Sequence, residues 1–150
     1  MDRHLADFLG KTPDAAMITL RADGSAHMAR IEVAVVNGRL WASGSAALVR
    51  THNLRRDPRC SLFVFGAHPD WVGVEAVVTI LEGPETPRQL VDFMRARHGE
   101  AAGPGMVFGH DDELGHDRPF TEAEFMDHVR AERRLIYQFE INRVYGNYPQ

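Results

Sequence analysis

The sequence is poor in cysteine and has no surplus of positive charge. Its single cysteine, Cys60, excludes a framework of internal disulfides and indicates a reducing cytoplasm. Because Cys60 lies in an apolar pattern typical of a strand, we expect a buried thiol rather than a nucleophile. The formal net charge of -4 at pH 7 provides no basic footprint for nucleic acid.

Long apolar runs are also absent. The first ten residues lack the apolar run of a signal peptide, and no stretch is long enough to span a membrane. We find no internal repeat, no Gly-x-Ser-x-Gly elbow and no Cys/His pair in a context that suits nucleophilic catalysis. The 150 residues therefore predict a single cytoplasmic domain, residues 1–150, with no membrane partner.

Two turn signals divide the first third of the chain into a meander of strands. Asp23-Gly24 and Asn37-Gly38 are typical of hairpin turns, since glycine accepts a positive φ. Strands are predicted over residues 15–21, 26–36 and 39–43, and Gly44-Ser45 is expected to break the third strand. The connections are too short for the crossovers of a parallel sheet.

The rest of the chain alternates predicted strands and helices. Further strands are predicted over residues 60–65, 71–82 and 135–144, with Gly73 marking a bend or bulge. Helices are predicted over residues 2–9, 46–56, 87–98 and 121–132, with Thr86 and Thr121 as N-caps. The predicted fold class is mainly β with α: a closed, six-stranded antiparallel barrel with peripheral helices.

Residues 39–65 contain the chemistry of an anion site. Hydroxyl groups are present at Ser43, Ser45 and Thr51, and Gly44 lets a ligand approach the backbone closely. The start of the predicted helix offers unpaired N–H groups and a partial positive charge. About one turn into that helix, Arg50 has the forked geometry that suits phosphate.

A second interpretation of the same helix stays open. Arg50, Arg55 and Arg56 also fit the solvated face of a short helix, and spacing alone favours this interpretation.

One run inside this stretch, Asn53-Leu54-Arg55-Arg56-Asp57-Pro58-Arg59, resembles the signature of the pyridoxamine 5′-phosphate oxidase-like superfamily of split β-barrels. The chain is most similar to the actinobacterial branch that binds the deazaflavin F420. Residues 16–31 fit the same family, and residues 132–146 resemble its closing strand. The resemblance covers most of the chain except about residues 99–120.

The resemblance implies a homodimer in which each of two cofactors lies in a groove between subunits. Arg30 and Glu32 on one strand, with Ser43 and Gly44 on the next, would lie beside the cofactor. Trp71 matches an aromatic residue near the edge of the ring in the F420-binding branch.

The implied phosphate site departs from the family pattern. Arg50 takes the position of the family's phosphate-binding lysine, and Thr51 would donate to the phosphate. Close relatives have arginine at the positions of Leu48 and His52, so the basic cluster here is weaker by one to two charges, with His52 only partly protonated at neutral pH. Arg30, where relatives have a small polar residue, would compensate; the alternative is a barrel-surface or interface charge.

The implied activity is redox chemistry. Reduced F420 would transfer hydride to an unsaturated small or medium organic substrate, while the protein supplies position and electrostatics. Glu32, His52 and Tyr137 are candidates for a proton donor that the sequence does not separate. The first alternative is an enzyme of the same fold that uses FMN, or one related to haem or pyridoxal phosphate. The second is a cofactor carrier without turnover.

Residues 99–120 are predicted to be the least regular segment. His110 and His116 are six residues apart with carboxylates between them, but this spacing matches no established metal motif, so we expect no metal site. We interpret the segment as a lid or substrate-facing insertion, with a plain solvated loop as the alternative.

Overall fold

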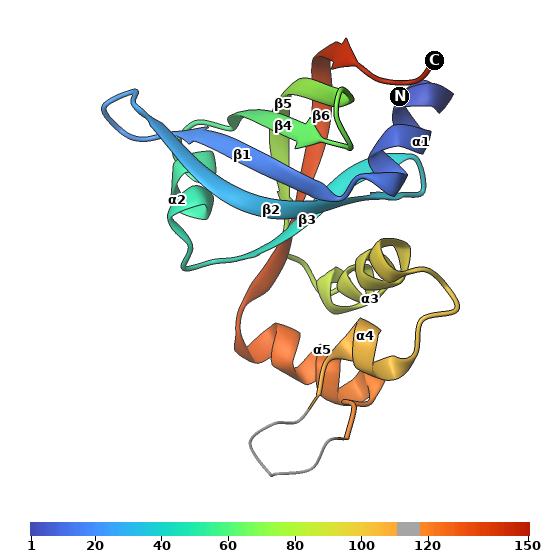
Figure 1. Cartoon of the computed structure of the whole chain (residues 1–150). Helices are drawn as coiled ribbons and strands as arrows, with labels where there is room; N and C mark the ends of the chain where they lie inside the picture. Colours follow the sequence, from blue (N-terminus) through green and yellow to red (C-terminus); the bar gives the residue numbers. More distant parts are fainter. Residues whose placement is uncertain (111–117) are drawn as a thin grey trace.

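Six antiparallel strands close into a barrel in the computed structural model, which describes residues 1–110 and 118–150 (Figure 1). The order around the barrel is β1-β2-β3-β6-β5-β4, which confirms the predicted fold class. The strands are β1 (Asp14–Leu20), β2 (Ala26–Val36), β3 (Arg39–Ser45), β4 (Arg59–Phe65), β5 (Trp71–Leu81) and β6 (Arg134–Asn147).

Helices in the described part of the chain lie outside the barrel. They are α1 (Arg3–Lys11), α2 (Val49–Arg56), α3 (Thr86–His98), α4 (Pro104–Phe108) and α5 (Glu122–Ala131). In Figure 1, α3, α4 and α5 form a layer below the barrel, while α2 lies at its left side. None of the described helices has the length and apolar character needed to cross a membrane.

The alternation of side chains along the strands produces two apolar cores. Inward-facing residues such as Leu62 fill the barrel, because successive residues of a strand point to opposite faces. Outward-facing residues, among them Trp41 and Ile136, pack against Phe93 of α3 and Phe125 of α5. The second core therefore attaches the helical layer to the outside of β2, β3 and β6.

The predicted hairpins are confirmed. Gly24 and Gly38 have φ values of 83° and 77°, and Asn37 has a φ of 50°. These positive φ values allow the tight turns that join β1 to β2 and β2 to β3.

The prediction that Gly44-Ser45 breaks the third strand is wrong. β3 continues through Gly44 to Ser45, paired with β6. A Cβ at Gly44 would collide with the ring and hydroxyl of Tyr137, so this glycine makes room for a side chain of the barrel interior. The start of the helix is displaced as well, because α2 begins at Val49 and places Arg50 in its first turn.

The bulge predicted at Gly73 lies elsewhere. The register between β5 and β6 shifts between Glu75 and Ala76, so that Asn142 is the extra residue on β6. Gly73 is regularly paired, and the ring of Tyr145 occupies the place where its Cβ would be. A large cross-strand neighbour therefore explains this glycine.

The observed ends of the helices agree with the predicted ends only in part. Thr86 is not the N-cap of α3; that position belongs to Glu85, and Thr86 is the first helical residue. Gly99, with a φ of 90°, ends α3 as predicted. Thr121 and Glu124 form the predicted capping box of α5, in which each side chain accepts from the other residue's backbone N–H.

The segment predicted to be least regular contains a short helix, α4. Val107 of α4 is buried, and the ring of Phe108 lies 5.5 Å from that of Phe125. Residues 111–117, which include His116 and the carboxylates, lie outside the described residues, so the role of this loop stays a prediction. Among the described residues, no group of His, Cys, Asp and Glu side chains has the arrangement of a metal site.

Cys60 is buried, as predicted, with 4% of its surface exposed. Burial raises the pKa of its thiol to about 12. The thiol is therefore protonated near neutral pH, which makes it a poor nucleophile.

Candidate functional site

The candidate site lies where β2 and β3 separate. Their pairing ends at Val33 and Ala42. Beyond this point β2 pairs with β1, as in Arg30 with Ala16, whereas β3 pairs with β6. We call this opening the β2–β3 fork; Figure 1 shows the two strands diverging toward α2.

Three residues predicted from the resemblance share the outer face of the fork. Ala34 and Trp41 are cross-strand partners on this face, so Arg30, Glu32 and Ser43 follow on the same side because side chains alternate along a strand. Arg30 is exposed and pairs with Asp14 at 3.0 Å. Glu32 pairs with Arg97 of α3 at 2.8 Å, which places the helical layer at one border of the fork.

Arg50 enters the site from the first turn of α2 and is half-buried. Its Nε atom is buried without a hydrogen-bond partner among the described residues. Its Cζ atom lies 5.9 Å from the centre of the Tyr137 ring. A buried guanidinium N–H without an acceptor is costly, and an anion at the start of the helix would satisfy it.

Thr51 lies behind Arg50 rather than beside it. Its side chain is fully buried, and its hydroxyl donates to the carbonyl oxygen of Ser45 at 2.6 Å. The hydroxyl of Tyr137 donates to the same Thr51 oxygen. Gly44 also belongs to this inner layer, because its missing side chain is replaced by the Tyr137 ring. Thr51 and Gly44 therefore position the start of α2 from inside the barrel.

The run Asn53–Arg59 fastens α2 to the barrel. Arg55 forms a bidentate pair with Glu82, the residue that follows β5, at 2.8 and 2.7 Å. Asn53 is buried and donates to the hydroxyl of Thr19 at 3.0 Å. These contacts take Arg55 out of the set of cations that are free to bind a ligand.

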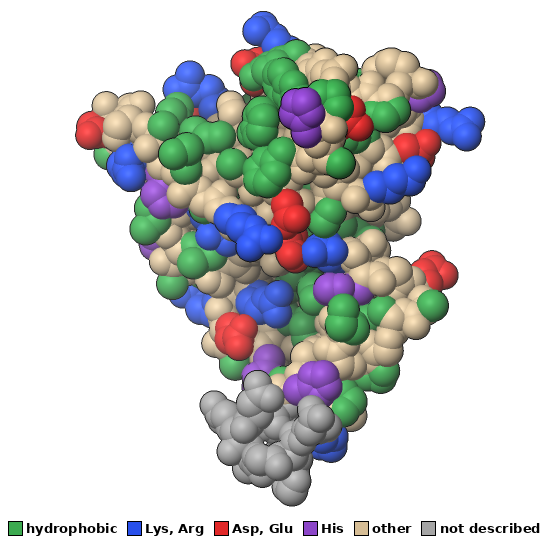
Figure 2. Space-filling view, in the orientation of Figure 1, with side chains coloured by type: hydrophobic (Ala, Val, Ile, Leu, Met, Phe, Trp, Pro, Cys, Tyr) green, Lys and Arg blue, Asp and Glu red, His purple; other side chains and the backbone are tan. Residues whose placement is uncertain are grey.

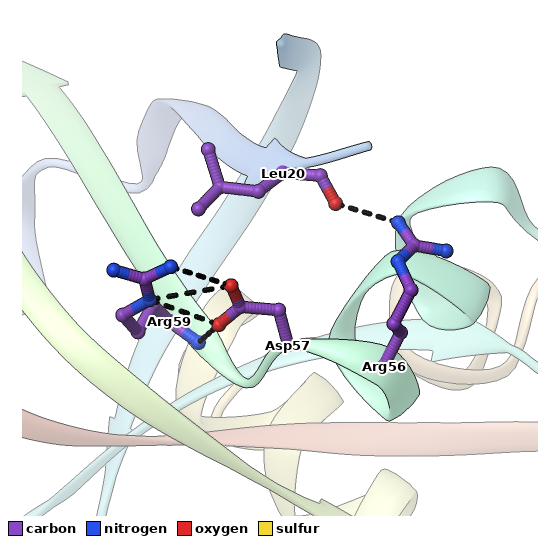
Figure 3. A network of polar contacts seen from close by, with 4 residues as sticks. All are labelled: Leu20, Arg56, Asp57 and Arg59. Carbon is purple, nitrogen blue, oxygen red and sulfur yellow. Dashed lines mark hydrogen bonds and ion pairs between the residues drawn. The ribbon is translucent and has the colours of Figure 1, made fainter. Parts of the chain in front are cut away.

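The second half of the same run is also engaged (Figure 3). Arg56 donates to the carbonyl oxygen of Leu20 at 2.8 Å. Asp57 accepts from the guanidinium of Arg59 at 2.7 Å, and this contact lowers the pKa of Asp57 to about 2. Arg55 and Arg56 are both exposed, as the interpretation of a solvated helix face expects, and each also has a defined partner.

The two positions that depart from the family pattern flank Arg50. His52 is exposed on α2, and Leu48 is the N-cap of that helix, without a side-chain cap. The backbone N–H groups of Thr51 and His52 donate to the carbonyl oxygen of Leu48. Arg50 is thus the basic side chain at the helix start, with His52 two residues beyond it.

Trp71 lies away from these residues in a single chain. It pairs with Phe65 at the far end of β4, whereas α2 immediately precedes the other end of that strand. Seven residues at about 3.3 Å each separate the two ends by roughly 20 Å. The outer face of the fork therefore carries Arg30, Glu32 and Ser43. Arg50 lies against Tyr137 at the start of α2, and Trp71 lies at the far end of β4.

Sequence reasoning missed a cluster of aromatic side chains around Trp71, which we call the aromatic face. Phe63 stacks on Trp71 with 5.3 Å between the ring centres, and Tyr145 approaches Trp71 edge-on with 6.2 Å between the ring centres. Phe65 adjoins Phe63 at 5.8 Å. Phe63, Phe65 and Tyr145 are exposed, with 41%, 46% and 48% of their surfaces accessible. The signal in the sequence was the presence of aromatic residues at outward-facing positions of β4 and β6.

A comparison with known proteins identifies the family of this chain. A sequence profile of one family, Pyridoxamine 5'-phosphate oxidase, matches residues 1–145. The chain belongs to the pyridoxamine 5′-phosphate oxidase family. A search of curated proteins found no match.

Solved structures with the same fold have diverse descriptions. The conserved hypothetical protein Rv2991 from Mycobacterium tuberculosis has a TM-score of 0.70 and 23% identity, covering 99% of this chain and 85% of its own. A protein described as F420 reductase has a TM-score of 0.63 and 14% identity, covering 97% and 98%. The heme storage protein HutZ from Vibrio cholerae has a TM-score of 0.62 and 11% identity, covering 96% and 93%. At these identities the likeness shows the fold that family members share.

Proposed function

We propose that the protein is a reductase that uses reduced F420 to reduce an unsaturated small or medium organic compound. The observation that carries this proposal is Arg50, whose Nε atom is buried and unpaired at the first turn of α2. The start of α2 fits the phosphate of a cofactor, because Arg50 offers an unpaired N–H there. The arginines of the run Asn53–Arg59 are engaged with neighbouring residues instead. The choice of F420 rests on the resemblance of this run and its surroundings to the F420-binding branch.

When bound, reduced F420 would supply the hydride for the reaction. We propose that Arg50 holds the phosphate, with His52 adding a partial charge beside it. Ser43, half-buried on the outer face of β3, would offer its hydroxyl to the cofactor. Arg30 and Glu32 would border the ring from β2, each held by its own ion pair.

The burial of the three candidate residues reduces the choice of proton donor to two. Tyr137 is fully buried, and burial raises the pKa of its hydroxyl. Its hydroxyl already donates to Thr51, so we assign Tyr137 to positioning α2. Glu32 and His52 are both exposed and remain the two candidates for protonating the substrate carbon, with solvent as the alternative source.

We also propose that two chains form a homodimer through the aromatic face, in the cytoplasm. Trp71 and Arg50 are separated by roughly the length of β4 in one chain, so the site is complete only if Trp71 of the partner subunit reaches the fork. The exposed aromatic residues Phe63, Phe65 and Tyr145 are the residue types enriched in protein interfaces.

Sedimentation velocity at micromolar concentration tests the dimer. We expect a dimer for the natural sequence and at least about tenfold weaker association for Phe65→Ser, because aromatic anchors carry much of the energy of an interface. Met106→Ser is the matched control, since Met106 is 60% exposed on α4, away from the aromatic face. A monomeric natural protein would overturn the shared site.

Fluorescence titration with F420 and, separately, FMN tests the cofactor. We expect tight binding of F420 and weak binding of FMN. The opposite order would make the protein an FMN-dependent member of the family, and binding of neither would reject the cofactor site. With F420 bound, oxidation of the reduced cofactor by an unsaturated ketone separates an enzyme from a carrier without turnover.

A further inference from the structure

A second pocket lies apart from the β2–β3 fork, where the start of α3 meets the start of β6. Its volume is about 370 Å³, at the lower end of the range for small-molecule sites. Its charged and polar lining comes from Glu82, Thr86, Arg130, Arg133 and Arg134. Figure 2 shows charged side chains gathered at the level where the barrel meets the helical layer.

The charges of this pocket do not cancel. Glu82 is neutralised by its bidentate pair with Arg55, and Arg130 pairs with Asp127 at 3.0 Å. The remaining two arginines of the lining, at the start of β6, form no salt bridge with any residue in the described ranges. Glu82 and Glu132 act on these two arginines only through longer-range attraction, so the pocket keeps a surplus of positive charge.

Arg134 is one of these two arginines, and its side chain is partly buried. Its guanidinium carbon lies 5.5 Å from the centre of the Phe125 ring. Burial lowers the pKa of the Arg134 side chain from its ordinary value, and Glu132 offsets the effect only in part. A partly buried guanidinium without a carboxylate partner is unfavourable unless an anion accompanies it.

Thr86, in the lining of the same pocket, supplies an independent observation. Only 3% of its surface is exposed, and its hydroxyl oxygen is buried without a hydrogen-bond partner among the described residues. Buried hydroxyl groups in proteins are nearly always hydrogen-bonded. An unsatisfied hydroxyl in the wall of an arginine-lined pocket is suited to an anionic oxygen.

We propose that this pocket binds the phosphate or carboxylate group of a small molecule, held by Arg133 and Arg134 and by the hydroxyl of Thr86. The site is distinct from the proposed cofactor site, because Arg50 does not line it. The two are neighbours in the fold: the backbone N–H of Ala46, in the turn before α2, donates to the carbonyl oxygen of Arg133 at 3.0 Å. A ligand in the pocket would thus lie against the turn that leads to Arg50.

Calorimetric titration of the full chain with inorganic phosphate and with succinate tests the proposal. Stronger binding of phosphate would assign the pocket to phosphorylated small molecules, and stronger binding of succinate to carboxylated ones. Binding of neither at millimolar concentration would overturn the proposal. The Nε–H signals of the arginines in NMR spectra identify the side chains that meet the anion, and those of Arg133 and Arg134 are expected to shift.

Two variants remove the anion contacts while preserving the fold. Thr86→Val keeps the shape of the side chain and removes a hydroxyl that has no partner among the described residues. Arg133→Gly places glycine at a φ of 50°, a conformation that glycine adopts more easily than arginine. We expect neither variant to lower the melting temperature, and each to weaken anion binding by roughly tenfold, the value of a charge-assisted hydrogen bond.

Two further variants separate this site from the others. Arg3→Gln removes a charge from an exposed position on α1 and should leave anion binding unchanged. Arg50→Ala should weaken cofactor binding but leave the phosphate-induced shifts of the Arg133 and Arg134 Nε–H signals intact, so failure of one proposal is distinguishable from failure of the other. Phosphate binding that survives Thr86→Val and Arg133→Gly but is lost in Arg50→Ala would overturn the pocket.

Discussion

Replacing Gly44 with alanine is expected to lower the free energy of unfolding by about 2–3 kcal/mol. The added Cβ would collide with the ring and hydroxyl of Tyr137, a fully buried side chain inside a closed barrel. A glycine-to-alanine change in a compatible conformation normally stabilises a protein by about 0.4–1 kcal/mol, so the collision must outweigh this gain. Urea denaturation monitored by circular dichroism measures the difference.

Gly10→Ala is the matched control for this prediction. Gly10 lies within α1, and nothing approaches the place where its Cβ would lie within 4 Å. Alanine there should raise the free energy of unfolding by up to about 1 kcal/mol, the difference in helix propensity. If both variants were as stable as the natural protein, Tyr137 would not fill the barrel beneath Gly44.

Replacing Arg50 with alanine is expected to weaken cofactor binding by about 1.5–3 kcal/mol, the worth of a hydrogen bond to a charged group. This corresponds to a roughly tenfold to 100-fold higher dissociation constant. The Nε atom of Arg50 is unpaired among the described residues, and the guanidinium otherwise lies over the Tyr137 ring, so the substitution should change the stability of the fold much less than it changes cofactor affinity. Fluorescence titration gives the affinity, and a melting curve of the free protein gives the stability.

Two further substitutions test whether the loss of affinity in Arg50→Ala is due to the guanidinium of Arg50. Arg50→Lys keeps the positive charge but loses the forked geometry, so its affinity should lie between those of the natural protein and Arg50→Ala. Arg59→Ala removes a nearby cation whose guanidinium is bound to Asp57 and should leave cofactor affinity unchanged. An unaltered dissociation constant in Arg50→Ala would reject the phosphate assignment.

Local signals were sufficient to predict most of the barrel. The turns at Asn37-Gly38 and Asp23-Gly24 and the capping box at Thr121 are determined by neighbouring residues, and all three are found in the structure. Gly44 and Gly73 were misinterpreted because the reason for each glycine is a side chain on β6, Tyr137 and Tyr145 respectively. Such partners are distant in the sequence and become visible only in the folded chain.

The sequence indicates candidate residues for the site, but it does not show which other residues they contact. The helix carrying Arg50, Arg55 and Arg56 was expected to present either an anion site or a solvated face; Arg55 is exposed, and it is also held by Glu82, 27 residues away. Similarly, Asn53 is held by Thr19, 34 residues away. Spacing within one helix cannot show which cations a distant strand has already neutralised. Family resemblance located Arg50, and the structure separated it from its engaged neighbours.

The attachment of α2 has a consequence for how this protein can change. Asn53, Arg55 and Arg56 are bound to the rest of the fold through Thr19, Glu82 and Leu20, so a substitution at any of these three positions would loosen the attachment of α2. His52 is exposed and Leu48 makes no side-chain cap, so these positions can vary with little effect on stability. The part of the helix that resembles the family signature is thus separate from the part that we propose meets the ligand, and on that proposal specificity could evolve at positions 48 and 52 without rebuilding the barrel.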